Sequence, residues 1–199
     1  MLFIEKVDVW LFQTLNLHLV HPIVDDFMVF LTSGKLSGHI LWLAAIFIVL
    51  RRGKKGFLVI IFTLLAVAFA DFVASGLLKP LVQRVRPCFA LEHFRLLIIQ
   101  VKSYSFASSH AANSAAVAVL TWIFFNKGAV IDKLFNLLMI MYALLIAYSR
   151  VYVGVHYPSD VISGSFIGCC SGLLVYLFFS WVMKNVVHLH FMRQEYLVG

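Results

Sequence analysis

Long apolar stretches constrain this chain more than any other feature of its sequence. A helix needs about 20 apolar residues to cross the roughly 30 Å hydrocarbon core of a bilayer. Four stretches meet that requirement, and a fifth, at 37–50, is marginal because it ends at Arg51. The four are residues 57–78, 108–126, 134–152 and 161–183. The sequence therefore predicts an all-α integral membrane bundle with about five to six transmembrane helices.

Composition agrees with a membrane protein. Of the 199 residues 62% are apolar and only 13% charged, whereas soluble domains average about half apolar and about a quarter charged. The three cysteines are too few for a disulfide scaffold, and the adjacent Cys169 and Cys170 lie in an apolar run where we expect them to pack as small hydrophobic residues. We expect the lipid bilayer, and no nucleic acid, as the partner of this chain.

The first 36 residues differ from the rest. Apolar residues recur at helical spacing between Phe3 and Leu15, which predicts a helix in the membrane interface. The charged Glu5, Lys6 and Asp8 argue against a cleaved signal peptide there. Residues 22–33 predict a second interfacial or partly inserted helix. We therefore divide the chain into an N-terminal segment (1–36), a transmembrane core (37–183) and a C-terminal tail (184–199).

Basic residues predict the orientation of the bundle. The densest cluster between two apolar stretches is at 51–55, and loops rich in Lys and Arg stay in the cytoplasm. Successive loops lie on alternate sides of the membrane, so residues 127–133 and the tail from Lys184 are predicted to be in the cytoplasm as well. The loops 79–107 and 153–160 then share the opposite, non-cytoplasmic surface.

Loop 79–107 is unusually basic for a non-cytoplasmic loop. Against Glu92 it carries five cations: Lys79, Arg84, Arg86, Arg95 and Lys102. Such residues often extend to lipid headgroups, but an anion-binding site would explain the concentration better. Lys79 and Arg86 are seven residues apart, so a short helix opened by Pro80 would point both side chains the same way.

Two further segments reach the same surface. Residues 105–110 lead into an apolar stretch that is predicted to be helical. The free backbone N–H groups at the start of that helix, together with a serine hydroxyl, can bind an anion. Residues 149–160 place Arg150, His156 and Asp160 within twelve positions. Two histidines beside three cations and a carboxylate indicate a catalytic constellation.

The order of these motifs resembles the type 2 phosphatidic acid phosphatase (PAP2) superfamily, which includes glucose-6-phosphatase and soluble vanadium-dependent haloperoxidases. The resemblance covers residues 57–183. It rests on three motifs in the family's order and spacing: Lys79-x6-Arg86-Pro87, Ser108-Ser109-His110 and Ser149-Arg150-x5-His156-x3-Asp160.

The resemblance implies hydrolysis of a phosphomonoester or diphosphate through a phosphohistidine. It implies that His156 is the nucleophile, that Asp160 orients its imidazole, and that His110 protonates the leaving oxygen. It also implies a set of phosphate ligands, namely Lys79, Arg86, Arg150, Ser108 and the backbone N–H of Ser109. Three fixed cations supply the charge that a divalent metal supplies in other phosphatases, so we expect no metal and no other cofactor.

One motif departs from the family pattern. Ala107 and Ser109 stand where the family usually has Pro and Gly. Glycine lets the backbone approach a phosphate without a Cβ. Ser109 can still donate its N–H if its φ is negative, so we expect activity with an altered local geometry or substrate preference.

Other polar residues near the motifs receive weaker assignments. Asp71 lies inside an apolar stretch, where a carboxylate needs a partner, and an interhelical hydrogen bond and a catalytic role are equally open. We expect Arg84 to be a solvated loop charge, with contact to a second phosphate or a headgroup as the alternative, and the same for Lys102. We expect Tyr152 and Tyr157 in the interfacial aromatic belt. Cys88 is given no role.

A lipid phosphate lies at the depth where the motifs emerge, so we expect a membrane lipid phosphatase of the compact bacterial kind, in the cytoplasmic (inner) membrane with its active site facing the exterior. We favour undecaprenyl diphosphate as substrate, with phosphatidylglycerol phosphate and the phosphates of lipid A as rivals. The non-enzyme alternative is a catalytically silent lipid-binding protein, and a small transporter ranks lower. The sequence leaves the oligomeric state open.

Overall fold

A computed structural model describes residues 3–182 and 184–185. These residues are mainly helical and contain no β-strand. The last part of the predicted tail, from residue 186, lies outside them. The elements, in chain order, are α1 (Phe3–Gln13), the π-helical η1 (Thr14–His18), α2 (Pro22–Thr32), α3 (Gly34–Arg52), α4 (Lys54–Asp71), the π-helical η2 (Phe72–Leu78), α5 (Lys79–Val82), α6 (Pro87–Ala90), α7 (Ser109–Phe125), α8 (Val130–Tyr152) and α9 (Pro158–Val182).

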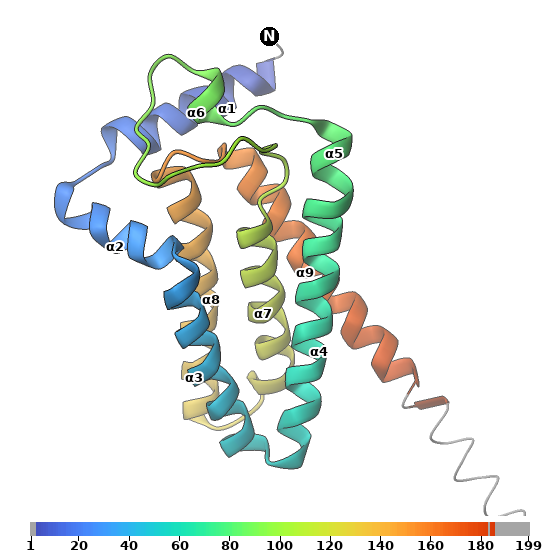
Figure 1. Ribbon diagram of the computed structural model, residues 1–199. Coiled ribbons are helices and arrows are strands. Elements are labelled where there is room, and N and C mark those ends of the chain that lie inside the picture. Colours follow the sequence, from blue (N-terminus) through green and yellow to red (C-terminus); the bar gives the residue numbers. More distant parts are fainter. Residues whose placement is uncertain (1–2, 183, 186–199) are drawn as a thin grey trace, which may run out of the picture.

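Five long helical rods form an antiparallel bundle (Figure 1). They are α3, the continuous rod of α4, η2 and α5, and then α7, α8 and α9. Each rod overlaps one of the apolar stretches found in the sequence, and α3 contains the marginal one. Within residues 3–182 and 184–185, three helical stretches are long and apolar enough to span a bilayer: 54–90, 130–152 and 158–182. The all-helical membrane fold is confirmed, and the predicted number of spans stays a prediction.

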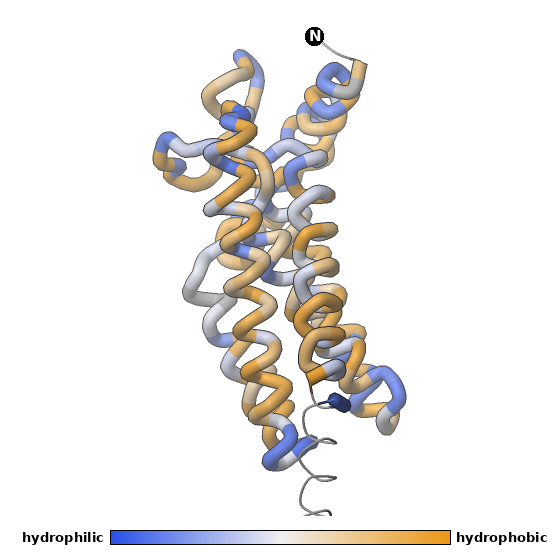
Figure 2. The backbone as a smooth tube through the Cα atoms, turned by 90° about the vertical axis from the view of Figure 1, so that its right-hand side faces the viewer, coloured by the Kyte–Doolittle hydropathy of each residue, from blue (hydrophilic) through white to orange (hydrophobic). Residues whose placement is uncertain are grey.

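The outside of the bundle is suited to lipid. Hydrophilic residues gather at its two ends, and the helices between them are mainly hydrophobic (Figure 2). Large apolar side chains point outward from four different helices at that depth, where water would disfavour them but hydrocarbon does not. Examples with more than 55% of their surface exposed are Trp42, Leu64, Leu138 and Phe166.

Helix α7 lies at the centre and contacts α4, α8 and α9. Its alanines are buried, and glycines of α9 face them closely. A Cβ on Gly168 would lie 2.0 Å from the carbonyl oxygen of Ala112, and one on Gly164 would lie 2.3 Å from that of Ser108. Small residues allow this backbone approach, as in other membrane helix pairs. The contact brings the start of α7 against the start of α9, where the second and third motifs lie.

The N-terminal helices cover one end of the bundle. Helix α1 lies crosswise over that end beside α6 (Figure 1). Its Phe3 and Trp10 are exposed, while Phe12 and Asp8 are buried against the bundle. The exposed face agrees with the predicted interfacial position, which stays a prediction. The buried face shows that α1 is also part of the packed structure around the motifs.

The predicted cytoplasmic basic cluster lies at the opposite end, where α3 turns into α4. Arg51 binds Asp132 of α8 at 2.8 Å, and Arg52 donates a 2.8 Å hydrogen bond to the carbonyl oxygen of Phe124. The cations at this end therefore anchor the α3–α4 turn to α7 and α8. The three motifs are gathered at the other end.

Candidate active site

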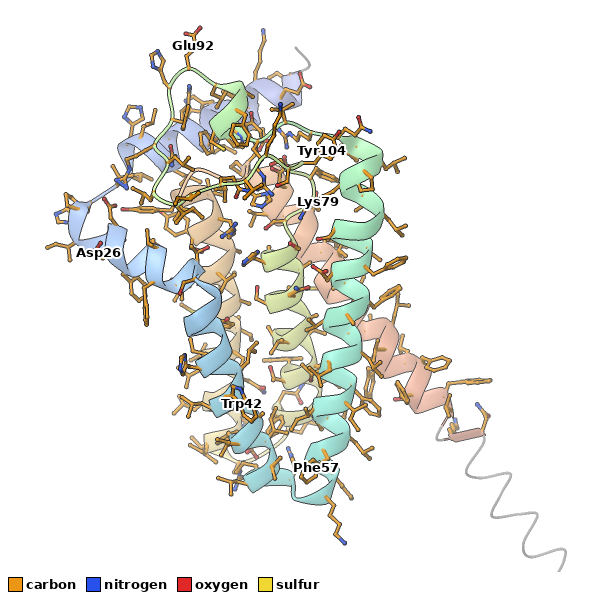
Figure 3. The ribbon with its side chains drawn as sticks, in the orientation of Figure 1. Asp26, Trp42, Phe57, Lys79, Glu92 and Tyr104 are labelled. Atoms are coloured by element: carbon orange, nitrogen blue, oxygen red, sulfur yellow. The ribbon has the colours of Figure 1, made fainter. Side chains whose placement is uncertain are left out.

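The three motifs meet at the end of the bundle that α1 covers. The first lies on α5 and the residues that follow, the second at the start of α7, and the third in the turn between α8 and α9. Figure 3 shows Lys79 and Tyr104 at this end, whereas Phe57 lies at the other. Segments that are far apart in sequence thus supply one cluster of polar side chains.

His156 is at the centre of the cluster and is almost fully buried. Its Nε2 lies 3.0 Å from a terminal nitrogen of Arg86, and its Nδ1 lies 3.6 Å from a carboxylate oxygen of Asp160. A guanidinium can only donate, so Nε2 must be the unprotonated nitrogen and Nδ1 carries the proton. The lone pair of Nε2 therefore points toward a cation.

Asp160 is fully buried, and both of its carboxylate oxygens are bonded. The oxygen facing His156 accepts hydrogen bonds from the hydroxyl of Ser105 and from the N–H of Tyr157, the latter at 2.9 Å. The other oxygen accepts from Arg84 at 2.7 Å. These bonds fix the carboxylate beside Nδ1 of His156.

Arg84 is not a solvated loop charge, so that expectation was wrong. Its guanidinium binds Asp160, Ser159 and Asp8 of α1, and it lies 3.9 Å above the ring of Tyr157. The pattern of the sequence gave no signal for this pairing, because Asp8 is 76 positions away and on a helix with an otherwise interfacial pattern.

Tyr152 and Tyr157 do not belong to an interfacial aromatic belt, and this expectation was also wrong. Both side chains are buried. The hydroxyl of Tyr152 donates to Asp25 of α2 at 2.7 Å, and the ring of Tyr157 lies under Arg84. They connect the N-terminal helices to the turn that carries His156.

The helix expected to link Lys79 and Arg86 does not form. Helix α5 ends at Val82 because Gln83 adopts a left-handed conformation with φ of 50°. Arg86 is extended, as a residue before proline usually is. The two cations nevertheless interact electrostatically, although they do not share a helix face.

Lys79 is held by a polar chain along its own rod. Its Nζ donates to the hydroxyl of Ser75 at 3.2 Å and contacts the hydroxyl of Ser109 at 3.4 Å. Ser75 in turn donates to Asp71 at 3.3 Å. The hydrogen-bond partner of Asp71 thus lies one turn away on the same rod, and the interhelical hydrogen bond considered for Asp71 is not seen among the described residues.

The start of α7 presents unsatisfied groups. Ser108 is buried and is the N-cap residue, and its hydroxyl oxygen has no hydrogen-bond partner among the described residues. Its N–H donates to the carbonyl oxygen of Asp160 at 3.0 Å. Ser109 is the first helical residue, a conformation with negative φ, so its N–H is available as the first N–H groups of a helix are. Serine thus fits where the family usually has glycine.

Arg150 and His110 complete the cluster. Arg150 is buried near the end of α8, with one terminal nitrogen on the hydroxyl of Thr32 and an Nε that has no partner in the described part of the chain. His110, on α7, interacts electrostatically with Arg150 and His156 and lines a cavity. A buried arginine with an unused donor suits a bound anion.

The remaining loop cations lie elsewhere. Arg95 pairs with Asp25 at 3.0 Å, and its backbone is bound on both sides by the buried amide of Asn16. Lys102 lines a cavity of about 310 Å³ together with Tyr104. Carboxylates thus neutralise Arg84 and Arg95, and the cations directed into the cluster are Lys79, Arg86 and Arg150.

The surroundings of His156 shift its titration. Burial lowers the pKa of His156 to about 4, and the positive charges of Arg86 and Arg150 act in the same direction, against the opposing effect of Asp160. The imidazole is therefore neutral near pH 7.

Among the described residues no three His, Cys, Asp or Glu side chains are grouped in a way that could hold a metal ion.

Comparison with known proteins defines the class. Residues 56–184 match the PAP2 superfamily. The chain is 29% identical to a lipid A 4'-phosphatase of Bacteroides thetaiotaomicron (87% of this chain, 77% of the relative) and 31% identical to one of Porphyromonas gingivalis (87% and 73%). It is 30% identical to an undecaprenyl-diphosphatase of Sulfolobus acidocaldarius (81% and 73%). The crystal structure of Aquifex aeolicus LpxE superposes with a TM-score of 0.69 at 26% identity, covering 85% of this chain and 94% of that one.

The protein is thus a membrane-embedded phosphatase with an all-helical fold. More specifically, the chain belongs to the PAP2 superfamily, as its motifs indicated.

Proposed function

We propose that this protein removes a terminal phosphate from a membrane lipid through a covalent phosphohistidine at His156. The contact between Arg86 and Nε2 of His156 carries this proposal. It directs the lone pair of a neutral imidazole to the place where an arginine would hold phosphoryl oxygens. A positioned neutral imidazole is an adequate nucleophile near neutral pH.

The reaction takes two displacements at phosphorus. Lys79, Arg86, Arg150, Ser108 and the N–H of Ser109 bind the phosphoryl oxygens. Nε2 of His156 attacks phosphorus, the bond from phosphorus to the lipid oxygen breaks, and His110 gives that oxygen a proton. In the second step a water molecule loses a proton to His110 and attacks phosphorus, so that the N–P bond breaks and inorganic phosphate leaves.

Asp160 stabilises the positive charge that the imidazole gains when it is phosphorylated, because its carboxylate lies on the Nδ1 side. The three cations stabilise the charge of the transferring phosphoryl group. The proposed reaction therefore needs no metal ion.

Lipid substrates fit the depth of the cluster, which lies at the end of an apolar bundle. On the sequence alone we favour undecaprenyl diphosphate as the substrate. Both an undecaprenyl-diphosphatase and lipid A 4'-phosphatases are similar to this chain. Two lipid A 4'-phosphatases match over 87% of it, which moves our preference to a phosphate of lipid A type. Hydrolysis of phosphatidylglycerol phosphate ranks third. We further propose an inner-membrane position with the site facing the exterior, in line with the basic cluster at the other end.

Phosphate release from purified protein in detergent tests this function. Wild type is expected to release phosphate from at least one substrate among lipid A, undecaprenyl diphosphate and phosphatidylglycerol phosphate. His156→Ala should remain folded and release none. Full activity of His156→Ala would refute the role of this residue, and an inactive wild type would favour the silent lipid-binding alternative.

A further inference from the structure

Helix α2 packs against the end of α8 that carries Arg150 (Figure 1). Met28 and Leu31 of α2 are buried in one apolar cluster with Ile146 of α8. Thr32 is the last residue of α2, and its spacing of four residues from Met28 places it on the same face of the helix. The packing of this face on α8 therefore brings the hydroxyl of Thr32 to the guanidinium of Arg150.

The position of Thr32 is fixed by contacts before and after it in the chain. Asp25, seven residues earlier and on the same helix face, accepts a 2.7 Å hydrogen bond from the hydroxyl of Tyr152. After Thr32 the backbone of Ser33 is extended, and the Ser33 hydroxyl donates to the carbonyl oxygen of Phe30 at 2.6 Å. Thr32 itself is buried. Its hydroxyl is thus a fixed point at which a neighbouring side chain can be held.

Thr32 gives Arg150 a hydrogen-bond acceptor that carries no negative charge. A terminal nitrogen of Arg150 donates to the Thr32 hydroxyl, and among the described residues no carboxylate forms an ion pair with this guanidinium. Arg84 and Arg95, by contrast, are paired with carboxylates. A carboxylate would offset the positive charge that attracts a phosphate, whereas a hydroxyl oxygen satisfies one N–H group and leaves that charge in place.

Arg150 needs such a contact because its surroundings are positive. Its side chain is buried, and it interacts electrostatically with Arg86. Like charges in one buried cluster repel each other strongly. Within the part of the chain that the structure describes, the hydroxyl of Thr32 is the one hydrogen-bond acceptor of the Arg150 side chain, and Nε of Arg150 is buried without a partner.

The proposed function gives this contact a consequence, and the following inference rests on it, because Arg150 is one of the three cations proposed to bind the phosphoryl oxygens. We infer that Thr32 is a positioning residue for phosphate binding, whose hydroxyl holds the guanidinium of Arg150 in the orientation that leaves its Nε for a phosphoryl oxygen. Thr32 lies before residues 56–184, which match the PAP2 superfamily. The N-terminal segment thereby contributes to the phosphate site a residue that the three motifs do not contain.

Binding of orthovanadate, a phosphate analogue, to purified protein in detergent tests this inference. Isothermal titration calorimetry measures the dissociation constant without any turnover. Thr32→Val keeps the shape of the side chain but removes the acceptor, and it is expected to weaken binding about tenfold, as is Thr32→Ala. Thr32→Ser, which retains the hydroxyl, should recover most of the lost affinity.

The matched control is Thr121→Val. Thr121 is also buried, but its hydroxyl donates to the carbonyl oxygen of Ala118 on its own helix, α7, at 2.9 Å. The dissociation constant of this variant should equal that of wild type. An unfolded fraction lowers the fitted stoichiometry and not the dissociation constant, so partial unfolding of Thr32→Val does not produce the expected result.

The effect of Thr32 should depend on the presence of Arg150. In an Arg150→Met background, Thr32→Val is expected to change the dissociation constant less than about twofold, because no guanidinium is left for the hydroxyl to hold. A hydroxyl that bound the anion directly would instead show the same loss in both backgrounds.

Wild-type affinity in both Thr32→Val and Thr32→Ala would overturn the inference. A loss that persists in the Arg150→Met background would overturn it too, since Thr32 would then not act through Arg150. Both results leave the proposed phosphatase function intact. Failure of the proposed function has a different signature, namely a wild-type protein that neither binds orthovanadate nor releases phosphate from any of the lipid substrates.

Discussion

Arg84 joins the N-terminal helix to Asp160, the carboxylate that lies beside His156. One terminal nitrogen of its guanidinium lies 2.7 Å from a carboxylate oxygen of Asp160, and the other binds Asp8 of α1. Asp8 also accepts a 2.9 Å hydrogen bond from the N–H of Ser159. Helix α1 is thereby connected to the polar cluster around His156 through two charged bridges, and we propose that Arg84 is a positioning residue for this cluster.

Arg84→Met should reduce kcat/KM about 100-fold, because Asp160 loses a charged partner and His156 is no longer held in its attacking orientation. The effect is expected in kcat more than in KM, since Arg84 is bound to carboxylates and not directed at the phosphate. Arg84→Lys should recover part of the loss.

The matched control for Arg84 is Arg95→Met. Arg95 also pairs with a carboxylate of the N-terminal segment, Asp25, but within the described part of the chain it makes no hydrogen bond or ion pair with Asp160 or His156. The Arg95→Met variant should have a lower thermal stability than wild type, with less than a fivefold change in kcat. Equal losses of kcat in the two variants would show that N-terminal anchoring alone explains the role of Arg84.

The pH dependence of kcat/KM should report the low pKa of His156. With a pKa of about 4, only about 1% of the imidazole is protonated at pH 6, compared with about three quarters at an ordinary pKa of 6.5. The activity should therefore not fall between pH 7 and 6 because of this group, and the acidic limb should lie below pH 5. The profile is measured in two buffers, so that effects of the buffer can be separated from titration of the enzyme. An acidic limb near pH 6.5 in both buffers would contradict the low pKa of His156.

The same shift affects stability. The unfolded chain binds a proton at His156 near pH 6.5, whereas the folded chain binds it only near pH 4. Stability should thus decrease as the pH falls through this window. His156→Gln should show a weaker decrease than wild type in thermal unfolding, and identical slopes would contradict the assigned pKa.

Sequence alone predicted the apolar helices and the grouping of the three motifs, because span length and motif order are local signals. It failed where a partner comes from a distant segment. Arg84 looked like a loop charge because Asp8 lies 76 positions away, and Tyr152 looked like a belt residue because its partner Asp25 is on another helix. The course of the chain from Lys79 to Arg86 also depends on the left-handed Gln83, a conformation that the sequence does not indicate.

Packing of α9 on α7 should be sensitive to side-chain size. Gly168→Ala introduces a Cβ only 2.0 Å from the carbonyl oxygen of Ala112, so the helices must separate. Overpacking of this kind costs about 1–3 kcal/mol, and a lower unfolding temperature in detergent is expected. Gly38→Ala on α3, where a Cβ meets nothing within 4 Å, is the control and should unfold like wild type.

Removal of divalent metals should leave turnover unchanged, because in the proposed mechanism Lys79, Arg86 and Arg150 supply the positive charge at the phosphoryl group. Initial rates are compared before and after dialysis against EDTA. A loss of activity that Mg²⁺ restores would contradict the role given to these three cations.

Trapping the covalent intermediate tests the central claim most directly. Wild-type protein is mixed with lipid substrate labelled with ³²P in the terminal phosphate, quenched in alkali within milliseconds, digested and analysed by mass spectrometry. The proposed mechanism predicts acid-labile label on the peptide that contains His156, and none in His156→Gln. Label on another residue, or full turnover by His156→Gln, would contradict it.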